Sequence, residues 1–396
     1  MGQCAGLYIH IPFCRKKCRY CDFYSIENTS LEKPFTDALK REMAFYAEKE
    51  LVFDSLYLGG GTPSLISVDH LLSILEHATT CFHFLENREV TIEVNPGTVS
   101  LEKLVSYYKA GITRLNVGIQ SFQDANLKLL GRIHTAEEGR TVIERARHAG
   151  YKNIGMDLII GLPGQGRGAL EADLIKTVSL HPEHISCYML SYEAGTPFYR
   201  MREKGEVRAL GDEQVGELYE ILVEFLTQNG YEHYEISNFA RIDSYSKGIS
   251  YRSKHNYKYW SGAPYIGLGP SAHSFLPPVR FWNVTDIEAY ISVLKEGRRP
   301  VEEEENLTPD QEMTEAIYLG LRTSDGIRLN PFRQKFGADF IRICRDVLSS
   351  LEKDGYLVVK KERLFLTRKG FLVSDAIVVK LMEEVEKVKP PLKQGL

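Results

Sequence analysis

Long apolar runs are missing from this sequence of 396 residues: it has no stretch of eighteen apolar residues, so we expect no segment to span a membrane. The first residues, MGQCAGLYIHIPF, lack the basic start and the small-residue cleavage site of a secretory signal. The formal net charge is only −4, which leaves no global attraction to nucleic acid. These absences predict a globular protein of the cytoplasm, for which peripheral association with a membrane stays open.

An even, spaced set of cysteines is also missing. The chain has seven cysteines, an odd number that does not suit a disulfide framework. Three of them lie within eight residues, in the segment IPFCRKKCRYCDF, at Cys14, Cys18 and Cys21. This crowding on one short loop is typical of a metal site.

The first half of the chain has the pattern of an α/β fold. Up to about residue 200, short β-rich runs alternate with longer helical patterns, which predicts parallel strands joined by crossover helices. The cysteine loop and the segments GGGTPS, EVNP, GIQS and GLPG stand at the carboxyl ends of these runs, where such folds carry their sites. The six expected strands are residues 7–11, 55–58, 90–94, 114–119, 154–160 and 184–189.

The second half predicts two further parts. Residues 209–306 contain one long helical pattern, at 213–228, followed by aromatic and glycine-rich loops. The acidic run at residues 302–305 is interpreted as a solvated linker. Residues 307–396 follow the order helix, helix, β-hairpin, helix, which indicates a winged-helix-like module. The expected domains are therefore residues 1–208, 209–306 and 307–396.

Three cysteines can hold three irons of a [4Fe–4S] cluster and leave the fourth iron open. The amino and carboxylate groups of S-adenosylmethionine (SAM) can chelate that iron, and an electron from the cluster can then cleave the sulfonium bond to a 5′-deoxyadenosyl radical. The basic neighbours Arg15, Lys16, Lys17 and Arg19 are expected to favour the thiolates. The alternative is a structural zinc site, which needs a fourth ligand, and His10 is the best candidate.

Six motifs make the sequence resemble the radical SAM superfamily: YIHIPFCRKKCRYCDF, GGGTPS, IEVNPGT, LNVGIQSF, LGRIHT and DLIIGLPGQ. Within it, the chain is similar to the anaerobic coproporphyrinogen III oxidase (HemN) family and to the related HemW heme chaperones. The similarity extends over nearly the entire chain. It implies a partial (β/α)6 TIM-like barrel of the α/β class, followed by a C-terminal α+β winged-helix-like module.

The resemblance also implies roles for residues of the glycine-rich loop. Gly60, Gly61 and Thr62 are expected to meet the methionyl amino group of SAM. Arg132 is expected to pair with the carboxylate, and Tyr20 to pack an aromatic face on the adenine.

Four further residues are expected near the same cofactor. Tyr8 should lie close to SAM, and Glu93 should accept hydrogen bonds from its amino or ribose groups. Gln120 and Asp157 should bind the ribose hydroxyls. An ordinary ion pair or turn cap stays the alternative reading of each, because their convergence depends on the barrel closing.

Two departures separate the sequence from the oxidase pattern CxxxCxxCxC. Phe23 stands in place of the additional cysteine, and only thirteen residues precede Cys14, where the oxidase resembles a longer chain. The segment HNYKYW at residues 255–260 instead fits the HNxxYW motif of the heme chaperones. His255 is therefore expected to ligate heme iron, with His273 as an alternative ligand. Basic residues that could meet the heme propionates are Arg252, Lys254 and Arg280.

The sequence thus predicts a heme chaperone of the radical SAM superfamily that binds a [4Fe–4S] cluster, SAM and heme. Its expected partners are heme-accepting respiratory proteins and an electron donor, and catalysis by the chain itself is left open. One alternative is an enzyme that decarboxylates coproporphyrinogen III without oxygen. Another is a nucleic-acid-binding module that uses the basic C-terminal hairpin, although the acidic net charge argues against it.

Overall fold

The computed structural model describes residues 3–243 and 250–388. It divides the chain into two compact units. The first unit contains most of the chain up to Glu305, and the second contains the chain from Asn306 onward together with the short segments His233–Ile236 and Tyr259–Gly262. The division of the first unit at residue 208 stays a prediction. In the described ranges, no helix is both long and apolar enough to cross a membrane.

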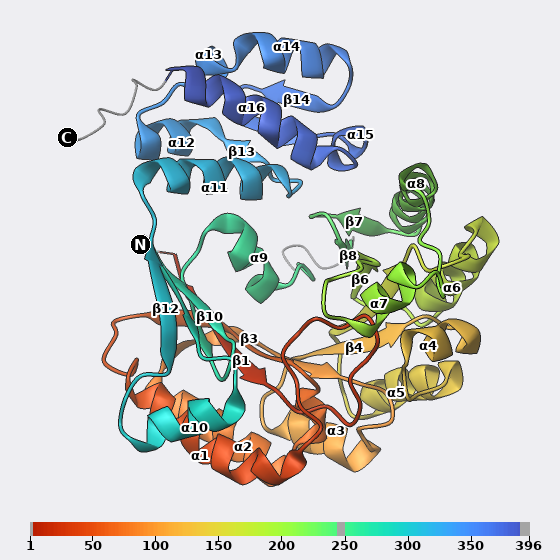
Figure 1. Cartoon of the computed structure of the whole chain (residues 1–396), viewed down its shortest axis with the longest axis vertical. Coiled ribbons are helices and arrows are strands. Elements are labelled where there is room, and N and C mark those ends of the chain that lie inside the picture. Colours follow the sequence, from red (N-terminus) through yellow and green to blue (C-terminus); the bar gives the residue numbers. More distant parts are fainter. Residues whose placement is uncertain (1–2, 244–249, 389–396) are drawn as a thin grey trace. The chain divides into compact units, whose positions relative to one another are not determined.

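Six parallel strands form the centre of a twelve-stranded sheet and lie side by side in chain order, which confirms all six expected strands. Figure 1 shows that they curve into part of a barrel. Their apolar residues are buried because crossover helices cover the outer side. The strands are β1 (Ala5–Ile11), β2 (Val52–Gly60), β3 (His83–Val94), β4 (Arg114–Gln120), β5 (Ile154–Ile160) and β6 (His184–Met189).

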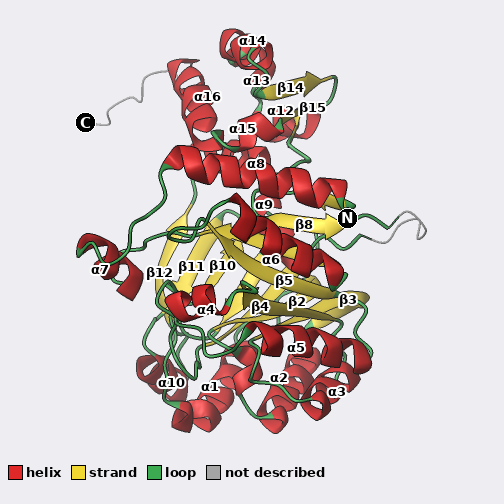
Figure 2. Cartoon of the chain, turned by 90° about the vertical axis from the view of Figure 1, so that its right-hand side faces the viewer, coloured by secondary structure: helices red, strands yellow, loops and turns green. Residues whose placement is uncertain are grey.

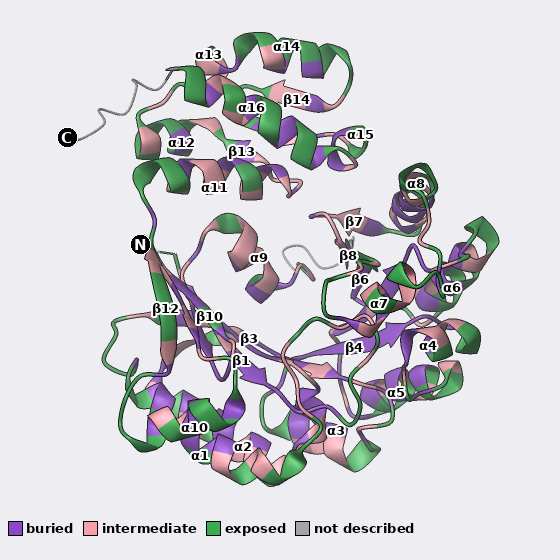
Figure 3. Cartoon of the chain, viewed as in Figure 1, coloured by how far each residue is buried: buried purple, intermediate pink, exposed green. Residues whose placement is uncertain are grey.

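The helices between these strands are amphipathic, as the apolar spacing predicted. In the first of them, Phe35, Ala38, Leu39 and Met43 form the buried stripe. Figure 3 shows the strands largely in the buried colour and the helices with one exposed side. The helices between the strands are α1 (Glu32–Ala44), α2 (Val68–Cys81), α3 (Leu101–Lys109), α4 (Asp124–Leu130), α5 (Ala136–His148) and α6 (Arg167–Ser179). Two more helices follow β6: α7 (Pro197–Glu203) and α8 (Asp212–Gln228).

The inner side of the curved sheet, which we call the concave face, is unusually polar. Side chains alternate between the two faces of a strand, and residues paired across strands share a face. The pairing of β1 to β6 therefore places on this face the side chains of Tyr8, His10, Tyr57, Glu93, Asn116 and Asp157. The apolar residues between them point toward the helices.

The sheet is wider than the sequence predicted. The segment after α8 was expected to form loops, but it adds strands at both ends: β9 pairs parallel with β1, and β8 pairs antiparallel with β6. These strands are too short for an alternating pattern to stand out in the sequence. The added elements are β7 (Tyr231–His233), β8 (Asn238–Arg241), α9 (Lys254–Ser261), β9 (Tyr265–Leu268), β10 (His273–Leu276), β11 (Val279–Asn283), α10 (Ile287–Lys295) and β12 (Val301–Asn306).

The acidic run at residues 302–305 is not a linker, so that prediction was wrong. It forms most of β12, the strand next to β11 at one end of the sheet. Its glutamates are mostly exposed, and charge on an outer strand discourages pairing with a second chain. A charge run in the sequence therefore marked a sheet edge.

The second unit has the helices and small sheet that were expected of a winged-helix-like module. Its antiparallel sheet has the order β13-β15-β14. Figure 2 shows two of these strands, β14 and β15. The helical segment at residues 340–353 is interrupted at Cys344, whose side chain is fully buried. The elements are α11 (Pro309–Leu321), β13 (Ile327–Arg328), α12 (Leu329–Phe336), α13 (Phe340–Ile343), α14 (Arg345–Lys353), β14 (Leu357–Lys360), β15 (Arg363–Leu366), α15 (Arg368–Phe371) and α16 (Ser374–Val388).

A buried carboxyl group joins α1 to the added strands. Glu42 is fully buried and accepts hydrogen bonds from the Tyr290 hydroxyl (2.5 Å), Asn283 Nδ2 (2.5 Å) and the Gly269 N–H (2.8 Å). Burial raises its pKa to about 7, while these donors lower it. The carboxyl thus satisfies donors from α10, from β11 and from the turn after β9.

We expect Glu42→Ala to lower the free energy of unfolding by about 3 kcal/mol, because it leaves buried donors without their acceptor. Denaturant unfolding followed by circular dichroism measures this change. The exposed Glu48→Ala on the chain just after α1 is the matched control. Equal stability of the two variants would show that the Glu42 contacts contribute little.

Candidate functional site

The cysteine loop begins where β1 ends, and backbone hydrogen bonds hold it in place. The Cys14 N–H donates to the Ile26 carbonyl at 2.8 Å, which closes the base of the loop. Farther along, the Arg19 N–H donates to the Leu130 carbonyl at 3.0 Å, and the Phe198 N–H donates to the Arg19 carbonyl at 2.9 Å. The loop is therefore attached to the ends of α4 and α7, at the carboxyl ends of the parallel strands.

The three cysteine thiols of this loop interact electrostatically. Burial is the main reason that the pKa of Cys21 is raised, to about 11, and Cys18 and Cys14 raise it further. The backbone hydrogen bond from Phe23 and the charge of Lys17 act in the opposite direction but do not compensate. The charge of Lys17 favours the Cys21 thiolate, as expected, but burial outweighs this effect. A bound cation would offset the electrostatic repulsion among the three thiolates.

The residues of the loop fit an iron–sulfur cluster better than a single ion. Within residues 3–243 and 250–388, no three His, Cys, Asp or Glu side chains converge as ligands of one ion would. A cubane cluster does not need such convergence, because each cysteine binds a different iron. His10, the candidate fourth zinc ligand, uses Nδ1 for a hydrogen bond with the Tyr8 hydroxyl (3.1 Å) and Nε2 for one with the Tyr24 carbonyl (2.9 Å).

Polar groups expected to bind SAM surround Cys18. Arg132 Nη1 lies 3.6 Å from Cys18 Sγ, and Arg132 Nη2 donates to Asn95 Oδ1 (2.5 Å) and to the Gly118 carbonyl (2.7 Å). A Cβ atom at Gly118 would lie 2.9 Å from Gln120 Nε2, so the Gln120 amide is packed against the same point. Arg132 and Gln120 therefore come together beside the cysteine loop, and their roles toward SAM stay a prediction.

Tyr20 belongs to the same group. Burial raises the pKa of its hydroxyl, whereas the charge and hydrogen bond of Arg132 lower it. Cys18 and Cys21 also act on it electrostatically, so the ring lies close to both thiols. The structure thus places Tyr20 and Arg132 together at the cysteine loop.

The glycine-rich loop that follows β2 allows its backbone to approach the cysteine loop closely. Gly60 has φ +109°, which favours glycine, and a Cβ atom there would lie 2.7 Å from the His10 ring. At Gly61 a Cβ atom would lie 2.8 Å from the Phe13 carbonyl oxygen. The Thr62 N–H donates to that carbonyl at 2.7 Å. Only glycine permits this approach at positions 60 and 61.

Asn95 joins the glycine-rich loop to the arginine, and the sequence reading missed it. Its Nδ2 donates to Thr62 Oγ1 at 2.8 Å, while its Oδ1 accepts from Arg132. Thr62 Oγ1 in turn lies 3.5 Å from Cys14 Sγ. One asparagine thus connects groups that contact two of the three cysteines. The signal was available, because Asn95 is a polar residue directly after the strand pattern that ends at Val94.

Two partly buried carboxyl groups of the concave face, Glu93 and Asp157, lie beside the glycine-rich loop. Glu93 accepts from the Tyr57 hydroxyl (2.9 Å) and from the Gly60 N–H (3.3 Å). Burial raises its pKa to about 8, and the charge of Asp157 adds to this. Asp157 Oδ2 accepts from Asn116 Nδ2 at 2.7 Å, but its buried Oδ1 has no hydrogen-bond partner among the described residues. A ligand with cationic and hydroxyl donors, as SAM offers, would satisfy both groups.

The structure places His255 on helix α9 and not on a loop. Its side chain is only 1% exposed, its ring stacks on the Tyr57 ring at 5.2 Å between centroids, and its Nδ1 lies 3.1 Å from Ser55 Oγ. Burial and the charge of Lys258 lower its pKa to about 3, so the imidazole is neutral. Tyr8, whose ring is 6.1 Å from that of His255, lies in the same part of the concave face. Ligation of heme by His255 stays a prediction that requires α9 to move.

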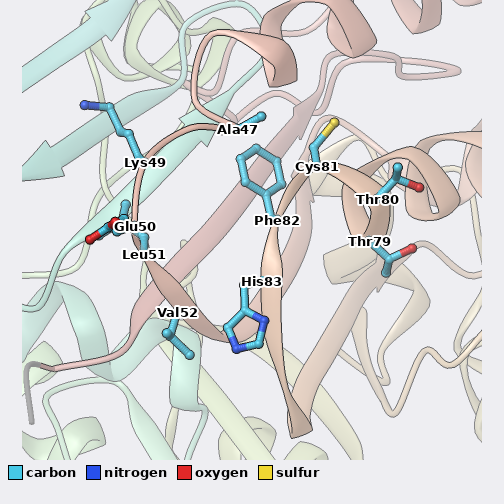
Figure 4. A pocket seen from close by; sticks show the side chains of 10 residues that line it. All are labelled: Ala47, Lys49, Glu50, Leu51, Val52, Thr79, Thr80, Cys81, Phe82 and His83. Carbon is cyan, nitrogen blue, oxygen red and sulfur yellow. The ribbon is translucent and has the colours of Figure 1, made fainter.

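A cavity of about 600 Å³ lies away from these residues (Figure 4). It includes Val52 and His83, the first residues of β2 and β3, whereas Gly60 and Glu93 lie at the other ends of these strands. The cavity is therefore not part of the candidate site. Its lining residues are Ala47, Lys49, Glu50, Leu51, Val52, Thr79, Thr80, Cys81, Phe82 and His83.

A curved parallel sheet with a three-cysteine loop and a glycine-rich loop at its carboxyl ends defines a radical SAM protein. Residues 8–174 match the model of the Radical SAM superfamily, and residues 307–373 match that of the HemN C-terminal domain. The chain is 34% identical over 375 residues to the heme chaperone HemW of Bacillus subtilis, covering 93% of this chain and 97% of that protein. It belongs to the HemW heme chaperone family within this superfamily.

Two other comparisons agree with this assignment. The chain is 32% identical over 387 residues to heme chaperone HemW of Mycobacterium tuberculosis, covering 96% of this chain and 95% of that protein. The structure of coproporphyrinogen III oxidase (HemN) from Escherichia coli superimposes with a TM-score of 0.81 at 24% identity, covering 96% of this chain and 90% of that one. At this identity the second comparison establishes the fold alone.

Glu93 should make the stability of the protein depend on pH. Its pKa is about 8 in the folded chain and 4.5 as a reference, so the folded state binds more protons than the unfolded state between these values. The contribution of protonated Glu93 to the free energy of unfolding is complete below pH 4.5 and is lost as the pH rises through about 8. We expect Glu93→Gln, which cannot ionise, to flatten the fall in melting temperature over this range.

Thermal melts of the protein without added SAM, at a series of pH values, measure this effect. Asp157 and Tyr57 are the other ionisable groups that act on Glu93, and both stay in place in the variant. The exposed Glu86→Gln on the same strand serves as control. Parallel melting curves for wild type and Glu93→Gln would contradict the raised pKa.

Proposed function

We propose that this protein is a heme chaperone that carries a [4Fe–4S] cluster on Cys14, Cys18 and Cys21 and binds SAM at the fourth iron. Membership of the HemW family supports heme handling. The observation that supports the cofactor site is that two cysteines contact residues of the expected SAM site. Thr62 Oγ1 lies 3.5 Å from Cys14 Sγ, and Arg132 Nη1 lies 3.6 Å from Cys18 Sγ.

The side chains around the cysteine loop have roles that follow from their positions. Arg132 would hold the carboxylate of SAM beside Cys18, since it is a partly buried cation whose Nη1 lies 3.6 Å from Cys18 Sγ. Glu93 would accept from the amino group near Gly60, and Tyr20 would cover the adenine. When bound, the cluster supplies an electron to the sulfonium group.

The remaining expected residues act deeper in the barrel. Asp157 and Gln120 would bind the ribose hydroxyls, because one Asp157 oxygen is buried without a partner among the described residues. Tyr8 lies next to Gly59, because a Cβ atom at Gly59 would lie 3.0 Å from the Tyr8 ring. The Tyr8 ring would therefore pack against the glycine-rich loop.

The partners follow from this function. We infer that the protein works in the cytoplasm, receives electrons from a donor and passes heme to respiratory proteins. Heme is then cargo and not a resident cofactor. Binding of SAM does not by itself imply that SAM is cleaved while heme is transferred.

Replacing any one of the three cysteines should abolish the cluster. We expect anaerobically reconstituted wild type to hold about four irons per chain, and its reduced cluster to change its EPR spectrum when SAM is added. Cys14→Ser, Cys18→Ser and Cys21→Ser should lose both properties. Cys81→Ser, outside the loop, should keep them. Zinc in the purified protein, or an iron centre that does not respond to SAM, would refute the proposal.

Coproporphyrinogen oxidase activity is the alternative to test directly. Phe23, at the position of the additional cysteine of the oxidase pattern, is 68% exposed and offers no ligand. We expect no decarboxylation when the reconstituted protein is incubated without oxygen with coproporphyrinogen III, SAM and a reductant. Conversion of the two propionates to vinyl groups, detected by mass spectrometry, would establish the enzyme instead.

A further inference from the structure

The backbone makes a strained turn where β4 ends, at Gln120. Gln120 has φ +68°, in the left-handed region that residues other than glycine rarely adopt. The Ser121 N–H donates to the Ile119 carbonyl at 2.9 Å, two residues back in the chain. A hydrogen bond of this span around a residue of positive φ is the pattern of a strained γ-turn. A residue with a side chain keeps such a conformation only when its surroundings hold it there.

This turn determines where the Gln120 side chain lies. Gly118 pairs with Asp157 of β5, but Gln120 pairs with Leu158, the next residue, so the register slips between them. Such a bulge re-aims the side chains around it. A Cβ atom at Gly118 would lie 2.9 Å from Gln120 Nε2 and 3.3 Å from Arg132 Nη2. The amide and the guanidinium therefore meet at one point of the concave face, in the expected SAM site.

Asp173 of α6 holds one side of the turn. It is 3% exposed, and its two oxygens accept from the Ser121 hydroxyl at 2.7 Å and from the Phe122 N–H at 2.9 Å. The Ser121 oxygen in turn accepts from the Gln123 N–H at 3.1 Å, which fixes the hydroxyl. Figure 1 shows α4 and α6 together on the outer side of the curved sheet. Asp173 therefore reaches the site only through the turn.

Two residues after α4 hold the other side of the turn. Arg132 Nη2 donates to the Gly118 carbonyl at 2.7 Å, and His134 Nε2 lies 3.2 Å from the Ile119 carbonyl oxygen. Burial lowers the pKa of His134 to about 4, so its imidazole is neutral and Nε2 can be the donor. This gives a role to the histidine of the LGRIHT motif. The strained turn is thus held from both ends by buried hydrogen bonds.

We propose that Asp173 is a positioning residue of the SAM site: by holding Ser121 and Phe122 it keeps Gln120 in the strained turn that places the amide beside Arg132. The inference rests on the proposed function, because it concerns the SAM site of that function. An amide that is held in place before the ligand arrives need not be ordered on binding, which increases affinity. The contribution of Asp173 therefore depends on the Gln120 side chain.

Titration of the anaerobically reconstituted full chain with SAM, followed by the EPR spectrum of the reduced cluster, tests this role. We expect Asp173→Ala to keep about four irons per chain. It should weaken SAM binding by at least about tenfold, because the turn loses two buried hydrogen bonds to a carboxylate. Ser121→Ala removes only one of them and should weaken binding by a smaller factor. Glu171→Ala is the matched control on the same helix, where Glu171 pairs with Arg167 at 2.9 Å.

A double-mutant cycle separates positioning from a general loss of structure. Gln120→Ala should weaken SAM binding on its own. Adding Asp173→Ala to this variant should cause little further loss, because the side chain that Asp173 positions is already absent. If the two losses multiply as independent effects do, Asp173 does not act through Gln120 and the inference is overturned.

Amide hydrogen exchange tests the turn in the absence of SAM. We expect Asp173→Ala to speed the exchange of peptides that contain residues 119–122, because their hydrogen bonds open more often. Glu171→Ala should leave this exchange unchanged. Equal exchange in Asp173→Ala and wild type would contradict the proposal even where SAM affinity falls, because the turn would not depend on the carboxylate.

The outcomes separate this inference from the proposed function. A wild-type cluster that does not respond to SAM refutes the SAM site of the proposed function. Wild-type binding that Asp173→Ala leaves unchanged keeps that function and overturns the role of Asp173. If Asp173→Ala cannot hold the cluster, Asp173→Asn takes its place, since it keeps an acceptor for the Phe122 N–H but offers none to the Ser121 hydroxyl. Unchanged SAM affinity in both Asp173→Asn and Ser121→Ala then overturns the inference, and weaker binding in both supports it.

Discussion

The arrangement of the site depends on one constraint: polar groups on the inner face of the sheet must find hydrogen-bond partners. The inner strands carry polar side chains on a buried face, where each unpaired group is costly. Asn95 resolves part of this constraint by pairing with both Thr62 and Arg132, which in turn contact Cys14 and Cys18. The cysteine loop, the glycine-rich loop and the arginine are consequently held in one hydrogen-bonded network. Nearby on the same face, Asp157 Oδ1 has no hydrogen-bond partner among the described residues, and a ligand can satisfy it.

The two histidines considered as heme ligands differ in their exposure to solvent. His255 is enclosed by Ser55, Tyr57 and Gly6, where a Cβ atom would lie 3.0 Å from its ring. In the same helix, Lys258 donates to the Cys4 carbonyl at 2.8 Å and pairs with an aspartate of β2, so α9 is anchored on the strands. His273 lies on the same face but is exposed. Their different exposure follows from where each lies in the sheet.

Much of this architecture could be predicted from the sequence, because strong local patterns indicate it. The strands β1 to β6 have apolar runs long enough to recognise, and the spacing of Cys14, Cys18 and Cys21 is distinctive. The added strands were missed because they are short, and the glutamates of β12 were read as a linker since nothing local shows a strand partner. Asn95 was missed because its importance depends on two residues distant in sequence.

By itself the sequence determined the α/β class, the cysteine loop and the family, because these depend on local composition and on residues close in the chain. Only the tertiary structure decided which polar residues meet. Glu93 and Asp157 act on one another's protonation across the sheet, and Thr62 reaches Cys14 from a loop 48 residues away. It also decided that His255 is buried and His273 exposed. Burial and pairing result from how strands are ordered in the sheet, which no local pattern specifies.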